Sequence, residues 1–225
     1  MARRRPYLSW ALWVVLSVTF LGAGQGASAQ TGCGGEFQYP AEEIESDIMR
    51  QILLGARGDI EEFFKFRFDA FCMDDEEYGA YYDVQGNYLV VGSEFFLDIA
   101  NPPGNINRAI AVLAHEAAHA FQAKHGLLNM LVETNPHRVK CIELHADFLA
   151  GGYMGWRAKK YNVDARNLTE MFYDLGDELA GADIHHGRKA ERFISFRQGF
   201  LTETTDEITL SSVGIAYVSQ AKCDE

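Results

Sequence analysis

The sequence predicts an α+β fold that is predominantly α and forms one domain. Along most of the chain, apolar residues recur every three or four positions, which is the pattern of a helix with one buried face. Only one short stretch is rich in β-forming residues. The 225 residues contain no internal repeat and no Pro- or Ser-rich linker, and this length suits a single core.

The first elements follow from spacing and from turn residues. Apolar side chains at helical intervals predict a helix over residues 41–55, which ends on a glycine, and a second helix or a continuation of it over 59–71. Tyr81 and Tyr82, then Tyr88 to Val91, flank a Gln-Gly-Asn turn at 85–87 and predict a short hairpin.

The rest of the chain has helical periodicity. We expect helices over residues 105–126, 137–160, 164–181, 187–202 and 206–222. The first of these ends at Gly126, a common helix terminator. On the second, Gly151, Gly152 and Gly155 recur, so we expect another helix to approach it closely.

Residues 1–29 have the composition of a secretory signal peptide. Three arginines precede an apolar run from Leu8 to Leu21, and small residues stand at Ala27 and Ala29. The run is shorter than the roughly 20 residues of a membrane span, so cleavage after Ala29 is favoured over a membrane anchor. We therefore expect an exported protein, in the periplasm or outside the cell, whose single domain covers residues 30–225. The general and the twin-arginine export routes both stay open.

The chain is acidic, with a formal net charge of −12. Residues 1–29 hold three arginines and no acid, so their removal makes the charge −15. Such a surface repels phosphate backbones, and nucleic acid is not an expected partner. The sequence does not indicate an oligomeric state.

Four cysteines lie after the signal segment: Cys33, Cys72, Cys141 and Cys223. An even number in an exported chain predicts one or two disulfides. Four cysteines allow three full pairings, and buried free thiols are the alternative.

The stretch "VLAHEAAHAFQ" (112–122) carries the strongest chemical signal. On a helix, residues four apart differ by only about 40° in direction, so His115 and His119 project side by side and can bind one metal ion. Glu116 lies about 100° from His115 and about 60° from His119, so it flanks the ion without ligating it. The alternative is an ordinary hydrogen-bonded histidine pair. It is disfavoured because the surrounding residues are apolar, and buried ionisable groups need a partner or a metal.

The stretch "CIELHADFLAGG" (141–152) supplies a third ligand. Catalytic zinc usually takes three protein ligands and a water. Glu143 and Asp147 are four apart and share a helix face, while His145 points roughly the opposite way. We expect Glu143 to bind the ion and Asp147 to orient a ligand histidine. His125 is the other nearby histidine, but it adjoins the glycine that ends its helix.

Together, "HEAAHAFQ" and "ELHADFLAG" resemble the gluzincin branch of zinc metallopeptidases. More narrowly, they resemble the bacterial neutral zinc metallopeptidase group and its relatives, the HtpX-like peptidases. "HHGRKAERFISFRQGF" is similar to a segment of that group in which His-Gly is followed by Arg six residues after the His, here His186, Gly187 and Arg192. "NYLVVGSEFF" resembles the family's edge strand, which leads into the active-site helix, so Tyr88 to Val91 are expected at an edge of the sheet. The resemblance covers roughly Tyr78 to Phe200.

This resemblance implies a zincin-like fold with a small hairpin or edge strand beside the active-site helix. It implies one Zn²⁺ per chain, Glu116 as general base, and His186, beside His185, as the group that steadies the developing oxyanion. A polypeptide substrate would lie along Tyr88 to Val91 as an added strand. Two alternatives stay open: a non-catalytic zinc-binding or chaperone-like protein of the cell envelope, and an interaction module that binds no metal.

Overall fold

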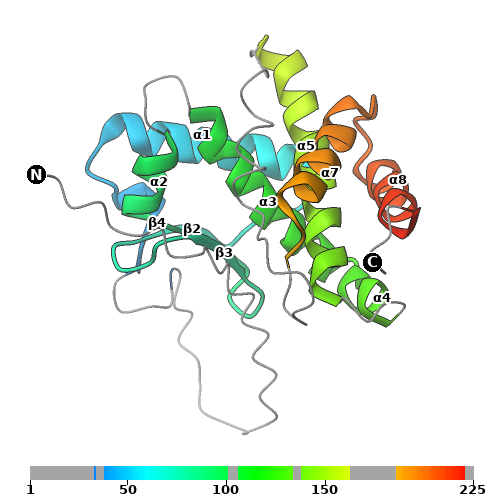
Figure 1. The fold of residues 1–225 in the computed structure, drawn as a ribbon. Coiled ribbons are helices and arrows are strands. Elements are labelled where there is room, and N and C mark those ends of the chain that lie inside the picture. Colours follow the sequence, from blue (N-terminus) through cyan, green and yellow to red (C-terminus); the bar gives the residue numbers. More distant parts are fainter. Residues whose placement is uncertain (1–32, 34–37, 101–105, 134–137, 163–185, 221–225) are drawn as a thin grey trace, which may run out of the picture.

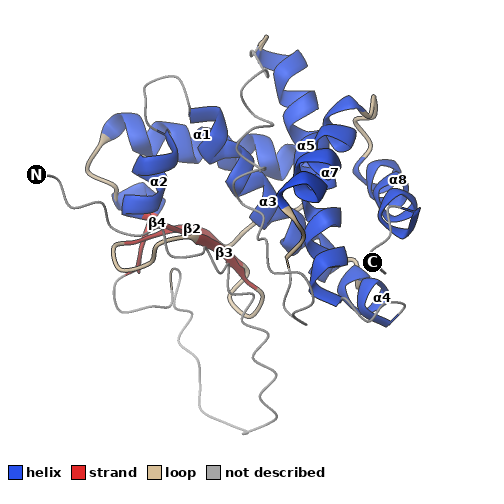
Figure 2. Cartoon of the chain, in the orientation of Figure 1, coloured by secondary structure: helices blue, strands red, loops and turns tan. Residues whose placement is uncertain are grey.

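A small mixed β-sheet and a larger group of helices make up the fold, as expected (Figure 1, Figure 2). The structure, a computed structural model, describes residues 33, 38–100, 106–133, 138–162 and 186–220. The elements are β1 (Gln38–Pro40), the 3-10 helix η1 (Ala41–Glu43), α1 (Asp47–Phe64), β2 (Ala70–Asp74), β3 (Ala80–Asp83), β4 (Tyr88–Gly92), α2 (Ser93–Ala100), α3 (Ile106–Lys124), α4 (Leu127–Glu133), α5 (Arg138–Tyr161), α7 (Lys189–Leu201) and α8 (Glu207–Gln220). The expected signal peptide and the helix expected over 164–181 lie outside the described residues.

The strand order of the sheet is β1-β2-β4-β3. The hairpin prediction is confirmed, because β3 and β4 pair antiparallel with Tyr82 opposite Leu89. The expectation that Tyr88 to Val91 form an edge strand is wrong. Strand β4 lies inside the sheet, between its parallel partner β2 and β3, and it leads into α2 and not into the motif helix. The edge that contacts α3 is β3.

Helices α1, α2 and α3 lie on one side of the sheet (Figure 1). Phe71 and Met73 of β2, like Leu89 and Val91 of β4, belong to the core that the sheet shares with these helices. The alternate residues form a separate cluster together with Cys33. The two inner strands are therefore buried on both faces, and their sequences show continuous apolar runs.

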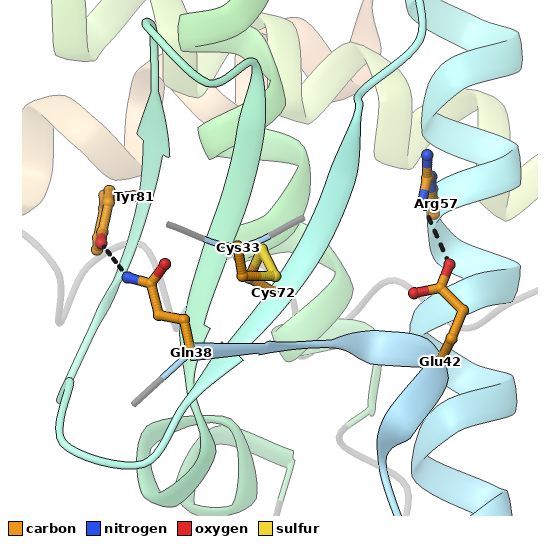
Figure 3. The surroundings of a disulfide bond; sticks show 6 residues. All are labelled: Cys33, Gln38, Glu42, Arg57, Cys72 and Tyr81. Carbon is orange, nitrogen blue, oxygen red and sulfur yellow. Dashed lines mark hydrogen bonds and ion pairs between the residues drawn. A yellow bond between two sulfur atoms is a disulfide. The ribbon is translucent and has the colours of Figure 1, made fainter. Parts of the chain in front are cut away.

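A disulfide joins Cys33 to Cys72 of β2, with 5.6 Å between the two Cα atoms (Figure 3). It lies beside the hydrogen bond from Gln38 Nε2 to the Tyr81 hydroxyl, which is 2.9 Å long. The prediction of at least one disulfide is confirmed. Cys141 is disulfide-bonded as well.

The helix expected over 59–71 ends early. Helix α1 runs to Phe64 as one element, and Lys65 terminates it with φ 55°. Beyond that point Phe66 and Phe68 are buried while Lys65 and Arg67 are exposed. This alternation of period two is the signature of extended chain, and it places β2 where helix was expected.

Helix α3 is the centre of the fold. All its residues from 109 to 122 are buried. It packs against α1, α2, α4 and α5 and against strands β3 and β4. A helix buried on all sides is a core helix, and its many alanines let these neighbours approach. None of the described helices is long and apolar enough to span a membrane.

The glycines of α5 allow backbone contact with α7, as expected. A Cβ atom at Gly151 would lie 2.0 Å from the Phe196 carbonyl oxygen, and one at Gly155 would lie 2.6 Å from that of Phe200. From α7, a Cβ at Gly199 would lie 1.8 Å from the Phe148 carbonyl oxygen. Only residues without a side chain fit at this crossing.

We therefore expect Gly199→Ala to lower the free energy of unfolding by about 3 kcal/mol or more, because the new methyl group overlaps backbone that cannot yield. The matched control is Gly55→Ala in α1, where nothing lies within 4 Å of the added Cβ. This control should raise the free energy of unfolding by about 0.5–1 kcal/mol. Urea unfolding measures both, and equal stabilities would contradict the close crossing.

Candidate metal centre

The sequence-predicted ligands meet where α3 crosses α5. His115 and His119 lie one turn apart on α3, and Glu143 and Asp147 lie one turn apart on α5. All four side chains are buried. Helical spacing puts each pair on one face, and the packing of the two helices brings the faces together.

His115, His119 and Glu143 form a cluster that could hold a metal ion. One ligand atom from each residue lies within 4.8 Å of the others. The two histidine Nε2 atoms are 3.1 Å apart, and His115 Nε2 lies 3.2 Å from Glu143 Oε2. His119 Nε2 lies 3.5 Å from Glu143 Oε1. Two nitrogens bound tetrahedrally to one zinc at about 2.0–2.1 Å lie roughly 3.3 Å apart, so the pair is close to that spacing.

Hydrogen bonds on the far side of each imidazole direct its Nε2 lone pair toward the cluster. His119 Nδ1 lies 2.9 Å from Gln122 Oε1 and donates its proton to it. His115 Nδ1 lies 2.9 Å from Asp147 Oδ1 and donates in the same way. In their neutral forms both histidines then present lone pairs to each other across 3.1 Å, which is unfavourable without a positive species between them. A metal ion fits this donor set, and so does a proton.

The pKa values of the two histidines shift in opposite directions, because only His115 has a carboxylate on each side of its ring. Burial lowers the pKa of His119 to about 4, so this imidazole is neutral near pH 7. Burial also lowers the pKa of His115, but the Asp147 and Glu143 carboxylates outweigh it and raise the pKa to about 9. Burial alone would raise the pKa of Glu143, yet the histidines around it hold it well below its usual range. The cluster therefore attracts positive charge.

Arg192 of α7 supports Asp147. Its guanidinium is fully buried and donates two hydrogen bonds to that carboxylate, from Nε to Oδ2 and from Nη2 to Oδ1, each 2.8 Å long. A bidentate pair of this kind fixes the carboxylate in position and leaves Oδ1 facing His115. The sequence names Arg192 only through the resemblance and assigns it no role. One signal was available: Arg192 shares a buried helix face with Ser195, Phe196 and Gly199.

His145 points away from the ligand cluster, as expected, but it is connected to it. Gln122 Nε2 donates to His145 Nδ1 over 3.0 Å and to the Ile142 carbonyl over 2.9 Å. Burial lowers the pKa of His145 to about 4, and the neutral ring faces the Ser211 carbonyl at 3.3 Å. Gln122 thus links two histidines, a role that sequence reasoning missed.

Glu116 lies beside the cluster and is not part of it. The side chain is buried, and a backbone hydrogen bond from Tyr82 of β3 reaches the carboxylate. Its second oxygen, Oε1, has no hydrogen-bond partner among the described residues. Burial raises the pKa of Glu116 to about 8. Glu116 thus lies outside the group of residues that could hold the ion, and it forms no ion pair among the described residues.

His186 stands just before α7, with its Nδ1 3.4 Å from Glu143 Oε1. Gly187 follows with φ 96°, a conformation that favours glycine, and an added Cβ would lie 3.3 Å from Leu144 Cδ2 and from Arg192 Cγ. The structure thus brings His186 to the edge of the cluster. His185 lies outside the described residues. His125 is exposed and packs on Phe121, away from the ligand atoms.

Comparisons with protein families, with curated proteins and with solved structures found no significant match to the chain. The function proposed below therefore rests on the geometry of this site.

The ligand set predicts how metal content responds to mutation. His119→Ala should lose stoichiometric zinc, because two remaining donors hold the ion poorly. His125→Ala, at the residue that follows the same helix, is the matched control and should keep one zinc per chain. Metal analysis after dialysis measures both. A stoichiometric ion in His119→Ala would exclude His119 as a ligand.

Asp147 is expected to contribute both to zinc affinity and to folding stability, and mutation can separate the two contributions. Asp147→Ala should weaken zinc affinity about 10- to 100-fold, since His115 loses its orienting partner. It should also cost about 3–5 kcal/mol of folding free energy, because the buried Arg192 loses its counter-charge. Adding Arg192→Met should restore most of the stability and none of the zinc affinity. Zinc competition titrations and urea unfolding test this; joint recovery of both properties would contradict it.

Proposed function

We propose that the chain is a zinc-dependent peptidase of gluzincin type, which hydrolyses peptide bonds with water as the nucleophile. His115, His119 and Glu143 hold one Zn²⁺. The observation that carries the proposal is the position of Glu116, buried next to the three ligand residues with one oxygen uncommitted. An ion with a purely structural role has no use for such a carboxylate.

Each residue of the site then has a task. When bound, zinc lowers the pKa of its water to about 7 and polarises the carbonyl to be cleaved. Glu116 Oε1 accepts the proton of the attacking water and returns it to the leaving amine. A pKa raised to about 8 by burial suits a group that takes and gives back a proton near neutral pH. In this proposal His186, whose Nδ1 lies 3.4 Å from Glu143 Oε1, would donate a hydrogen bond to the oxygen on which negative charge develops.

The substrate of this proposal is a polypeptide that adds to the edge of β3. Gly92 N donates to Gly79 O over 2.8 Å, so Gly79 faces β4. Because antiparallel strands alternate, Ala80 and Tyr82 turn their backbone polar groups to the outer edge. The hydrogen bond from Tyr82 to Glu116 is consistent with this direction. A bound peptide strand would thus run past the proposed general base, along β3 and not along Tyr88 to Val91.

A non-catalytic zinc-binding or chaperone-like protein of the cell envelope is the alternative. Structural zinc sites are usually closed by four protein ligands, whereas the described residues supply three to this cluster. This count favours the peptidase, since a catalytic ion keeps one position for water.

Export to the periplasm or the medium is also part of the proposal. The Cys33–Cys72 disulfide supports it, because disulfides persist in oxidising compartments. The signal-like residues 1–29 support it independently.

Glu116→Gln tests the proposal most directly. Glutamine keeps the size of the side chain and cannot take a proton, so zinc content should stay at one per chain while peptidase activity falls at least ~10²-fold. Cleavage of fluorescein-labelled casein and metal analysis measure the two properties. Chelation should abolish wild-type activity, and added zinc should restore it.

The exposed Glu45→Gln is the control and should change neither property. Loss of zinc in Glu116→Gln would make Glu116 a ligand. Absence of proteolysis in zinc-loaded wild type would favour the non-catalytic alternative.

A further inference from the structure

A pocket of about 370 Å³ opens between the end of α3 and the hairpin. Ala120 and Lys124 of α3 line it on one side, and Tyr82 of β3 lines it on another. Phe66 and Arg67, from the segment after α1, are also among its lining residues.

The pocket continues the face of α3 that carries the proposed general base. Ala120 and Lys124 stand four and eight residues after Glu116, so the three share one helix face. Tyr82 joins the two places, because its backbone bonds Glu116 and its side chain lines the pocket. A peptide on the edge of β3 would therefore direct a side chain into this pocket.

The wall of the pocket is held in place by hydrogen bonds. Asn87 Nδ2 donates to the Arg67 carbonyl over 3.0 Å and to Asp69 Oδ1 over 3.1 Å. The Tyr82 hydroxyl donates to Asn87 Oδ1 over 3.2 Å. These bonds tie the segment after α1 to the hairpin, so the pocket exists before any ligand binds.

Two cations, Arg67 and Lys124, line the pocket, and none of its lining residues in the described part of the chain is a carboxylate. The Arg67 side chain is 90% exposed, and its Nη1 lies 3.9 Å from Glu61 Oε2. Glu61 already accepts from Arg57 Nε over 2.9 Å and from the Phe68 backbone over 3.1 Å. Lys124 Nζ sits 5.2 Å from the centre of the Phe66 ring, which holds the ammonium at the pocket.

Two acids near the pocket residues in sequence, Asp69 before β2 and Asp83 of β3, are bonded to other groups. Asp69 accepts from Asn87, and Asp83 accepts from the Gly86 backbone over 2.6 Å. Neither lines the pocket. The chain carries a net charge of −12, so a pocket whose described charged lining residues are both cations differs from the molecule as a whole.

We propose that this pocket is a specificity site that selects polypeptides carrying an aspartate or glutamate side chain near the scissile bond. The inference rests on the proposed peptidase function. The Arg67 guanidinium and the Lys124 ammonium bind the carboxylate, while Phe66 and Tyr82 contact its aliphatic stem. Exposed ion pairs contribute modestly, so two of them give a preference of about 5- to 20-fold over the neutral amide.

The test is a cleavage map of the zinc-loaded full chain on a mixture of synthetic dodecapeptides, read by mass spectrometry. In wild type, Asp and Glu should be enriched about 5- to 20-fold at one position relative to the cleaved bond. Arg67→Gln with Lys124→Gln should abolish this enrichment, and Arg67→Glu with Lys124→Glu should replace it by Lys and Arg. Raising NaCl to about 0.5 M should weaken the wild-type preference, because salt screens exposed charges.

The matched control, Lys159→Gln with Arg197→Gln, removes two exposed cations elsewhere and should keep the wild-type map. Identical maps for wild type and the Arg67/Lys124 glutamine variant would overturn the pocket assignment and leave the peptidase proposal standing.

A binding measurement separates the two proposals if no cleavage occurs. Fluorescence anisotropy compares a labelled Ala/Ser-rich peptide with one central Glu and its Gln counterpart, in the Glu116→Gln background. Tighter binding of the Glu peptide that is lost with Arg67→Gln and Lys124→Gln supports the pocket even if the peptidase proposal fails. Equal affinities for both peptides, or no binding of either, would overturn it.

Discussion

The buried pair of Arg192 and Asp147 is the interaction on which the site depends. Three acids and two histidines lie together in the interior, and each would favour neutrality there if left alone. Arg192 supplies a permanent positive charge and, through its two bonds to Asp147, holds that carboxylate in position beside His115. That carboxylate orients His115, and Glu143, 3.5 Å from the same guanidinium, gains a second positive neighbour. Helices α3, α5 and α7 are thus tied together by charge as well as by packing.

Ligation and proton transfer fall on different residues of one helical turn. His115 and His119 face α5, where the carboxylates stand, whereas Glu116 faces β3. A rotation of about 100° between adjacent residues is enough for this division. The edge of β3 then places the backbone of a peptide next to the carboxylate. The chemistry proposed for the chain therefore depends on where this short strand lies, as much as on the helix that carries the motif.

The parts of the site that follow local rules could be predicted from the sequence. Residues four apart on one helix share a face wherever the helix lies, so His115 with His119, and Glu143 with Asp147, followed from spacing alone. The hairpin followed from its turn residues, and the close helix crossing from recurring glycines. The contacts that complete the site cross between elements: Arg192 and Asp147 are 45 residues apart, and Gln122 and His145 are 23 apart. No local pattern encodes such pairs. The strand order could not be predicted for the same reason. It depends on the parallel pairing of β2 with β4, which places β3, the first strand of the hairpin, at the edge of the sheet.

The backbone contact between α5 and α7 bears on how firmly the site is held. Side chains at a helix interface can change rotamer and let two helices slide, but carbonyl groups set against glycines have no such freedom. The backbone contacts at Gly151 and Gly199 thus fix the position of α7 along α5. Arg192 lies two turns before Gly199 on α7, so the same backbone contact also fixes the distance between the Arg192 guanidinium and Asp147. Glycines, which have no side chain, therefore help to preorganise the site. They lose more conformational entropy on folding than other residues, but the close helix contact they allow holds Arg192 and Asp147 rigidly together.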